Sequence, residues 1–140
     1  MYKNSICAFI GMAGSAIASA FGGWDASLKT LIIFMITDYV TGLIVAGVFK
    51  KSKKTETGAL ESRIGWKGLC RKGMTLLYVL IAVRLDILVG TSYIRDAVCI
   101  GFIVNEMISI TENAGLMGVS IPVPIVKAID VLKKKLDDQD

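Results

Sequence analysis

Five polar residues recur at helical spacing inside an apolar stretch, roughly residues 94–114, in the second half of the chain. They are Asn105, Glu106, Ser109, Glu112 and Asn113. This spacing places all five on one side of a helix. Two carboxylates on one face could act as general acid and base, but no nucleophile, histidine or metal-ligand cluster accompanies them. We therefore predict that this face packs against other helices or contacts water, and that the protein is not an enzyme.

The absence of histidine limits the chemistry further. None of the 140 residues is a histidine, which excludes Ser/His/Asp and Cys/His nucleophilic systems and removes the commonest metal ligand. The three cysteines, Cys7, Cys70 and Cys99, are far apart and lack C-x-x-C spacing. No catalytic residue, metal site or cofactor is predicted.

Single charges also interrupt two other apolar stretches. Asp38 lies near the middle of Leu28–Phe49. An acid at that depth costs about 2.5–3.5 kcal/mol in a bilayer, so it should face protein or water. Arg84 and Asp86 lie in the short stretch 74–90 and point about 200° apart on a helix, so they should pair elsewhere. We expect Arg84 to pair with Asp38; the alternative is that Arg84 extends to the outer interface beside Asp86.

The composition indicates that these stretches lie in a membrane. Hydrophobic residues make up 54% of the chain, and its mean hydropathy is +0.61, whereas soluble domains are about 45–50% apolar. We predict an all-α fold, a small polytopic membrane protein with a single domain over residues 1–140. The four expected transmembrane helices, the third of them marginal in length, are residues 6–23, 28–49, 74–90 and 94–114.

Basic residues between the second and third stretches indicate the topology. Half of the sixteen basic residues lie in this loop, and they are Lys50, Lys51, Lys53, Lys54, Arg63, Lys67, Arg71 and Lys72. A short basic loop favours the cytoplasmic side, so residues 50–72 and both termini are expected in the cytoplasm, with the basic side chains against anionic lipid headgroups. A solvated loop and a nucleic-acid site are the alternatives, and we expect no nucleic-acid partner. The tail, residues 122–140, should form an amphipathic cytoplasmic helix.

Small residues dominate the first apolar stretch. The predicted helix-packing residues are Gly11, Gly14, Ser15, Ala18, Ser19 and Gly22, together with Gly42 in the second stretch. Small side chains let helix backbones approach closely in lipid. The short turn 24–27 predicts that the first two helices form an antiparallel hairpin. Two alternatives remain open: small residues are common in membrane helices of any kind, and Ala18-Ser19-Ala20 is similar to a signal-peptide cleavage site.

Several short motifs from Trp24 to the tail form a recognisable set. They are Asp38-Tyr39-Val40-Thr41-Gly42, then Ser62, Gly65, Gly68, Leu69 and Lys72, then Asp86, and finally Asn105-Glu106, Ser109-Ile110, Glu112-Asn113, Gly118 and Pro122. With these residues the chain resembles the toxin secretion/phage lysis holin family of Gram-positive bacteria and their phages. The string that contains Asn105-Glu106 and Glu112-Asn113 is the most specific part.

The resemblance implies a function that composition does not. Such proteins accumulate as multi-pass proteins in the bacterial cytoplasmic membrane, assemble into homo-oligomers and open lesions. An endolysin then reaches the peptidoglycan, or a large toxin is released, without direct binding to the holin being implied. The resemblance therefore predicts pore formation and host cell lysis or toxin secretion for this chain.

The membrane charges suggest how such a protein would work. We hypothesise that copies of the chain shelter one another's polar side chains, because unsatisfied groups cost several kcal/mol in hydrocarbon, and then rearrange around a water-filled opening. The candidate pore-lining or intramembrane polar residues are Asp38, Arg84, Asp86, Asn105, Glu106, Ser109, Glu112 and Asn113. The alternatives are a small proton- or ion-coupled transporter and a non-conducting membrane scaffold.

Overall fold

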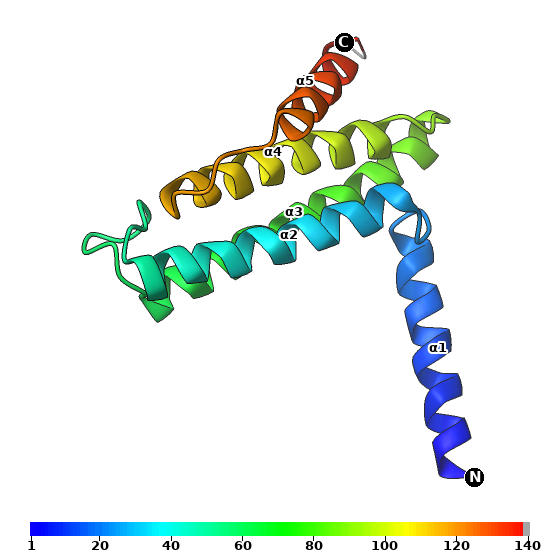
Figure 1. The fold of residues 1–140 in the computed structure, drawn as a ribbon. Coiled ribbons are helices and arrows are strands. Elements are labelled where there is room, and N and C mark those ends of the chain that lie inside the picture. Colours follow the sequence, from blue (N-terminus) through cyan, green and yellow to red (C-terminus); the bar gives the residue numbers. More distant parts are fainter. Residues whose placement is uncertain (139–140) are drawn as a thin grey trace.

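The computed structural model describes residues 1–138, and these residues form helices and connecting loops only. The elements in chain order are α1 (Tyr2–Ala20), α2 (Ala26–Ile44), the π-helical turn η1 (Val45–Phe49), α3 (Ser62–Val89), α4 (Ile94–Leu116) and α5 (Val123–Asp137). The predicted all-α class is confirmed. Figure 1 shows α2, α3 and α4 side by side as a three-helix bundle, with α1 and α5 extending away from it.

The core of the bundle is aliphatic. Leu31 of α2, Val79 of α3 and Cys99 of α4 are fully buried, and the same cluster contains Leu28, Met35 and Ile103. These side chains recur at helical spacing on α2 and α4, so each helix presents one apolar stripe to its neighbours. The stripe explains why α2 and α4 form the most extensive contact in the bundle.

Helix α2 continues through η1 as one helical segment. Asp25 caps its first turn by accepting a hydrogen bond from the backbone N–H of Leu28 at 3.0 Å, and Lys50 ends it in the left-handed conformation with φ 52°. In residues 1–138, Ala26–Phe49 is the one segment that is clearly long and apolar enough to cross a membrane. In α1, α3 and α4, polar or charged residues interrupt or shorten the apolar stretches.

Helix α3 corrects the predicted boundary of the basic loop. Residues 62–72, expected to be part of that loop, are helical and run without a break into the third apolar stretch. The helix continues because nothing between Lys72 and the third apolar stretch, except Gly73, opposes a helix. The true loop is therefore residues 50–61, and the basic residues from Arg63 onward lie on a long helix of the bundle.

Helix α1 contradicts the predicted hairpin with α2. None of its residues is buried, and in Figure 1 it points away from the bundle. The reason lies in the turn, where Gly22 and Gly23 have φ values of 82° and 102°. Glycine adopts this left-handed region without steric cost, so the chain changes direction sharply before α2 begins. The small residues of α1 are not buried within the described residues, although several line a cavity beside α2, and their role in packing stays a prediction.

The chain after α4 breaks and restarts as predicted. Pro122 caps α5 and Pro124 lies in its first turn, where the missing N–H costs nothing. The amphipathic helix is confirmed, but its apolar side packs on α4 in this structure: Ile129 is buried against Ile100 and Val104. The last two residues of the predicted tail, 139–140, lie outside the described residues.

Tyr39 marks the closest approach of α2 to α3. Its hydroxyl donates a hydrogen bond to the backbone carbonyl of Gly65 at 3.4 Å, and its ring lies over Gly68, where an added Cβ would meet the ring at 3.7 Å. At Gly65 an added Cβ would lie 3.3 Å from the Tyr39 hydroxyl oxygen, a tight contact. The two glycines therefore make room for the aromatic ring between the helices.

Substitution of Gly65 by leucine should destabilise the bundle by about 1–3 kcal/mol, because the larger side chain displaces Tyr39 from a packed interface. The matched control is Gly73→Leu on the same helix, where an added Cβ meets nothing within 4 Å. Both variants gain helix propensity, so their difference reports crowding alone. Thermal unfolding in detergent, followed by circular dichroism, measures it; equal midpoints for the two variants would contradict the assignment.

Candidate functional site

A lysine between two carboxylates joins the three helices of the bundle. The Lys72 Nζ of α3 lies 2.7 Å from Asp38 Oδ2 of α2 and 2.5 Å from Glu106 Oε2 of α4. The carboxylate side chains are only 8% and 7% exposed, and that of Lys72 is 15% exposed. Three charges from three helices thus meet in one buried cluster.

The remaining oxygen of Asp38 is bonded as well. Its Oδ1 accepts hydrogen bonds from Ser109 Oγ at 2.5 Å and from Asn113 Nδ2 at 3.1 Å. The same Asn113 amide lies 2.9 Å from Thr41 Oγ1, and that hydroxyl donates to the carbonyl of Thr37 at 2.8 Å. Asp38 is therefore fixed at both oxygens, and the network ties one side of α2 to one side of α4.

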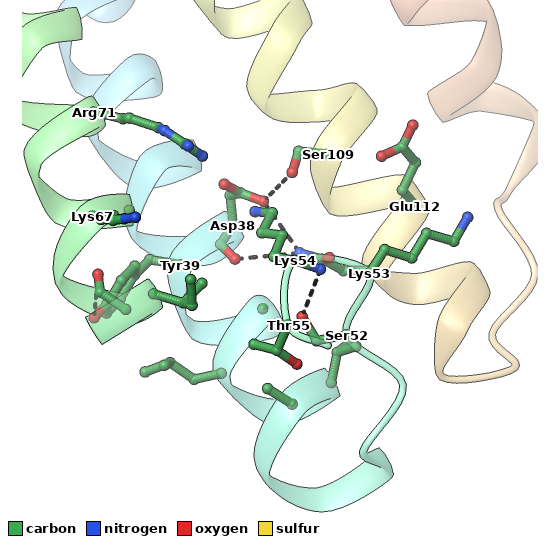
Figure 2. A pocket seen from close by; sticks show the side chains of 18 of the residues that line it. Asp38, Tyr39, Ser52, Lys53, Lys54, Thr55, Lys67, Arg71, Ser109 and Glu112 are labelled. Atoms are coloured by element: carbon green, nitrogen blue, oxygen red, sulfur yellow. Dashed lines mark hydrogen bonds between the residues drawn. The ribbon is translucent and has the colours of Figure 1, made fainter. Parts of the chain in front are cut away.

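A cavity of about 460 Å³ opens beside this network. Figure 2 shows Lys53 and Lys54 of the loop reaching over it toward Asp38 and Glu112, while Arg71 enters from α3. Six of the eight predicted polar residues line this cavity: Asp38, Asn105, Glu106, Ser109, Glu112 and Asn113. The face predicted on α4 thus meets the charge of α2 around one polar space.

The cluster of Asp38, Lys72 and Glu106 stabilises the bundle, and the loss of one of its charges would destabilise it. Removing one partner of a buried ion pair costs about 3–5 kcal/mol, because the other charge is left uncompensated. Here one ammonium pairs with two carboxylates, so both α2 and α4 depend on Lys72 of α3. No group of three or more side chains that could hold a metal ion occurs in residues 1–138. The chemistry of this site is charge pairing between helices.

Two predictions about these charges are wrong. Arg84 does not pair with Asp38; its side chain is exposed on α3. Lys72, predicted at the membrane surface, takes that place. In addition, Asp38, Glu106 and Asn113 are sheltered by their own chain, whereas we expected neighbouring copies to shelter them.

Counting from the loop ends of the helices would have identified Lys72. Asp38 lies 49 − 38 = 11 residues from the end of η1, Lys72 lies 72 − 62 = 10 residues into α3, and Glu106 lies 116 − 106 = 10 residues from the end of α4. At about 1.5 Å per residue, the three stand at the same height. The boundary placed at residue 72 hid this match, because it kept Lys72 outside the helix.

A second polar group closes the opposite end of the bundle. Asp86 Oδ1 accepts hydrogen bonds from the Ile94 backbone N–H at 3.0 Å and Thr91 Oγ1 at 2.7 Å, and its Oδ2 accepts the Arg95 N–H at 2.8 Å. These contacts satisfy two of the free N–H groups that begin α4, those of Ile94 and Arg95. Asp86, predicted among the intramembrane polar residues, caps a helix here.

Arg95, which the sequence analysis did not single out, fixes the turn between α1 and α2. Its Nε donates to the carbonyl of Phe21 at 2.7 Å, and its Nη1 lies 2.6 Å from Asp25 Oδ2. An added Cβ at Gly22 would meet Arg95 Nε at 2.7 Å, so only glycine fits beneath the guanidinium. Arg95 therefore fixes the point at which α1 leaves the bundle. The pairing of Asp25 with Arg95 could not be inferred from residues 70 positions apart.

Comparison with known proteins shows what the chain is similar to. The model of the bacteriophage holin family matches residues 15–134. An uncharacterised 14.9 kDa protein in the nagH 3′ region of Clostridium perfringens is 38% identical over 87% of this chain and 88% of its own length. A probable holin of Bacillus phage phi105 is 32% identical over 80% of this chain and 78% of its own length. No solved structure matches the chain.

The fold and the site define a small all-helical protein with one highly apolar segment and a buried cluster of charges. The chain belongs to the bacteriophage holin family. Membership implies a location in the membrane, and proteins of this family are generally not enzymes. The motifs that carried the resemblance also meet in space, because Asp38 and Tyr39 contact Lys72 and Gly65, respectively.

Replacing Lys72 with methionine should destabilise the bundle by about 3–5 kcal/mol, because two buried carboxylates lose their common cation. The matched control, Lys67→Met, removes an exposed lysine that lines the same cavity on the same helix. Chemical unfolding in detergent micelles compares the two. If both variants unfold at the wild-type midpoint, the cluster does not hold the helices together.

The pair of Asp25 and Arg95 gives a prediction about pH. The hydrogen bond from Arg95 lowers the pKa of Asp25 below its ordinary value of 3.8. A lowered pKa in the folded state stabilises the fold above the unfolded pKa, and this contribution is lost as the pH falls through the folded pKa. Because the Asp25 side chain is 47% exposed, the contribution is at most about 1 kcal/mol.

Asp25→Asn keeps the helix cap but removes the charge. Its stability should lie below that of the wild type by a constant amount from pH 7 to about pH 5, and the difference should shrink below about pH 4. Thermal midpoints in detergent across this range measure it. Asp130→Asn, at an exposed position of α5, is the control, and a difference for Asp25→Asn that persists to pH 2 would contradict the ion pair.

Proposed function

We propose that this protein is a pore-forming holin that oligomerises in the bacterial cytoplasmic membrane and permeabilises it, so that an endolysin or a toxin can leave the cytoplasm. Family membership supports a holin-like role. The observation that carries the mechanism is the cluster of Asp38, Lys72 and Glu106, because it places charges from three helices where a rearranged assembly could expose them to water.

The arrangement in the membrane follows from the charges. In this proposal α1, α2, α3 and α4 span the bilayer, with Lys72 at the depth of Asp38 and both termini in the cytoplasm. The basic loop 50–61 and the first turns of α3 lie at the cytoplasmic surface, where anionic lipids attract lysine and arginine. The exposed small residues of α1 supply the surface through which copies of the chain associate.

In this proposal, the buried charges exchange their protein partners for water when the pore opens. In the closed subunit they satisfy one another, which is tolerable in a low-dielectric bundle only while the geometry holds. When subunits accumulate and the bundle rearranges, the same groups line a water-filled opening and recover their hydration. Depolarisation can favour this step, since about 2.3 kcal/mol acts on each charge that crosses 100 mV.

A small ion-coupled transporter is the second candidate, favoured by the exchangeable position of one ammonium between two carboxylates. Solute size separates the two functions. A holin should release a folded enzyme trapped inside vesicles, whereas a transporter should retain it and pass only small ions.

Replacing Asp38 with alanine removes the partner of Lys72, Ser109 and Asn113, and we expect it to weaken the closed bundle and advance the onset of lysis. The control is Thr37→Ala on the preceding residue, whose hydroxyl bonds only within its own helix, to the carbonyl of Ile33 at 2.8 Å. Culture density after induction together with an endolysin measures the onset, and crosslinking measures the oligomer size. Wild-type timing and oligomer size for Asp38→Ala would remove Asp38 from the mechanism.

A further inference from the structure

Helix α5 occupies the face of α4 that is opposite its polar side. Ile100 and Val104 of α4 form a buried cluster with Ile129 of α5. Met107 and Ile108 of α4, and Leu132 and Leu136 of α5, pack against this cluster. All the contributing side chains are apolar, so the contact is a continuous hydrophobic interface between the two helices.

The covered face has the composition of a lipid-facing surface. On a helical wheel Ile100, Val104 and Ile108 lie roughly 180° from Glu106, Ser109 and Asn113. The polar three face α2 and α3, where they take part in the ion-pair cluster or line its cavity. In a helix that crosses a bilayer, the polar side packs inward and the aliphatic side meets lipid.

The depth of this contact conflicts with the charges on α5. The contact is centred near Val104, close to the middle of Ile94–Leu116, so it would lie near the bilayer centre. The solvent side of α5 carries exposed charges, which are Lys127, Asp130, Lys133, Lys134, Lys135 and Asp137. Cations at that depth are strongly disfavoured. The aliphatic side of α4 therefore cannot face lipid while α5 is packed on it.

We propose that α5 is an internal cover on the lipid-facing side of α4, and that it must leave before this side enters the bilayer. The proposal rests on the proposed function in one respect, the passage of α4 across the membrane. Figure 1 shows that α5 is joined to α4 by a connecting segment, and α4 is the helix of the bundle that α5 mainly contacts, so its release leaves the contacts among α2, α3 and α4 intact.

The released helix has an alternative site of its own. Its apolar side, which includes Ile129, Leu132 and Leu136, suits the headgroup boundary of a membrane, and its lysines suit anionic lipid. The membrane can therefore bind both surfaces of this interface, the apolar side of α5 and the aliphatic side of α4. In solution, or in a chain not yet fully inserted, α5 keeps the aliphatic side of α4 away from water.

The first test alters the interface at Ile129. Ile129→Asp should raise the fraction of chains with α5 released by about tenfold or more, because a buried isoleucine is replaced by a charge. The matched control is Val131→Asp on the same helix, whose side chain is 64% exposed. Purified full-length chains are added to anionic vesicles that contain a trapped dye. We expect faster leakage from Ile129→Asp than from Val131→Asp, and leakage at equal, measurable rates would overturn the proposal.

A second measurement does not depend on leakage. Spin labels at the exposed positions Asn105 and Val131, introduced as cysteines in a chain carrying Cys7→Ser and Cys70→Ser, report the distance between α4 and α5. This distance should lengthen when anionic vesicles are added. An unchanged distance in membrane-bound protein would contradict the proposal that α5 leaves α4. If the wild type never causes leakage but the distance between α4 and α5 still lengthens, the proposed pore formation is contradicted and the release of α5 from α4 is supported.

Discussion

An ammonium group held between two carboxylates, at one height in three helices, is the constraint on which the bundle depends. Asp38, Lys72 and Glu106 satisfy one another inside a single chain. Each alone would be costly in hydrocarbon, and together they are tolerated only while α2, α3 and α4 keep their register. The aliphatic core around Leu31, Val79 and Cys99 fixes that register by packing, so the apolar and polar parts of the interior support each other.

This arrangement changes what self-assembly has to accomplish. A chain with orphan charges would have to associate in order to be stable in lipid, whereas this chain already satisfies its charges when alone. In the proposed function, copies of the chain therefore associate through other surfaces, and α1, with none of its residues buried, offers one. The proposed opening then separates and hydrates the buried charges. Under that proposal, different parts of the chain stabilise the subunit and assemble the pore.

Local patterns predicted the helices well, because hydrophobic stretches, the Pro122 and Pro124 break and the spacing of Asn105, Glu106 and Ser109 are all local signals. They predicted the polar face of α4 for the same reason, but its contact with Asp38 was not predicted, because that contact depends on how α2 and α4 pack. Lys72 was missed because its charge favoured a surface role, although its distance from the start of α3 matches, to within one residue, that of Asp38 from the end of η1. Arg95 was missed because its partners lie in a turn more than 70 residues away.

The cysteines of the chain have a practical consequence. Cys7 and Cys70 are exposed, whereas Cys99 is enclosed between the helices of the bundle. In the natural sequence, two thiols are thus open to a modifying reagent while the bundle is intact, and a third becomes reactive only when α4 separates from its neighbours. The protein carries its own indicator of whether the bundle is intact, readable by counting modified thiols in an intact membrane.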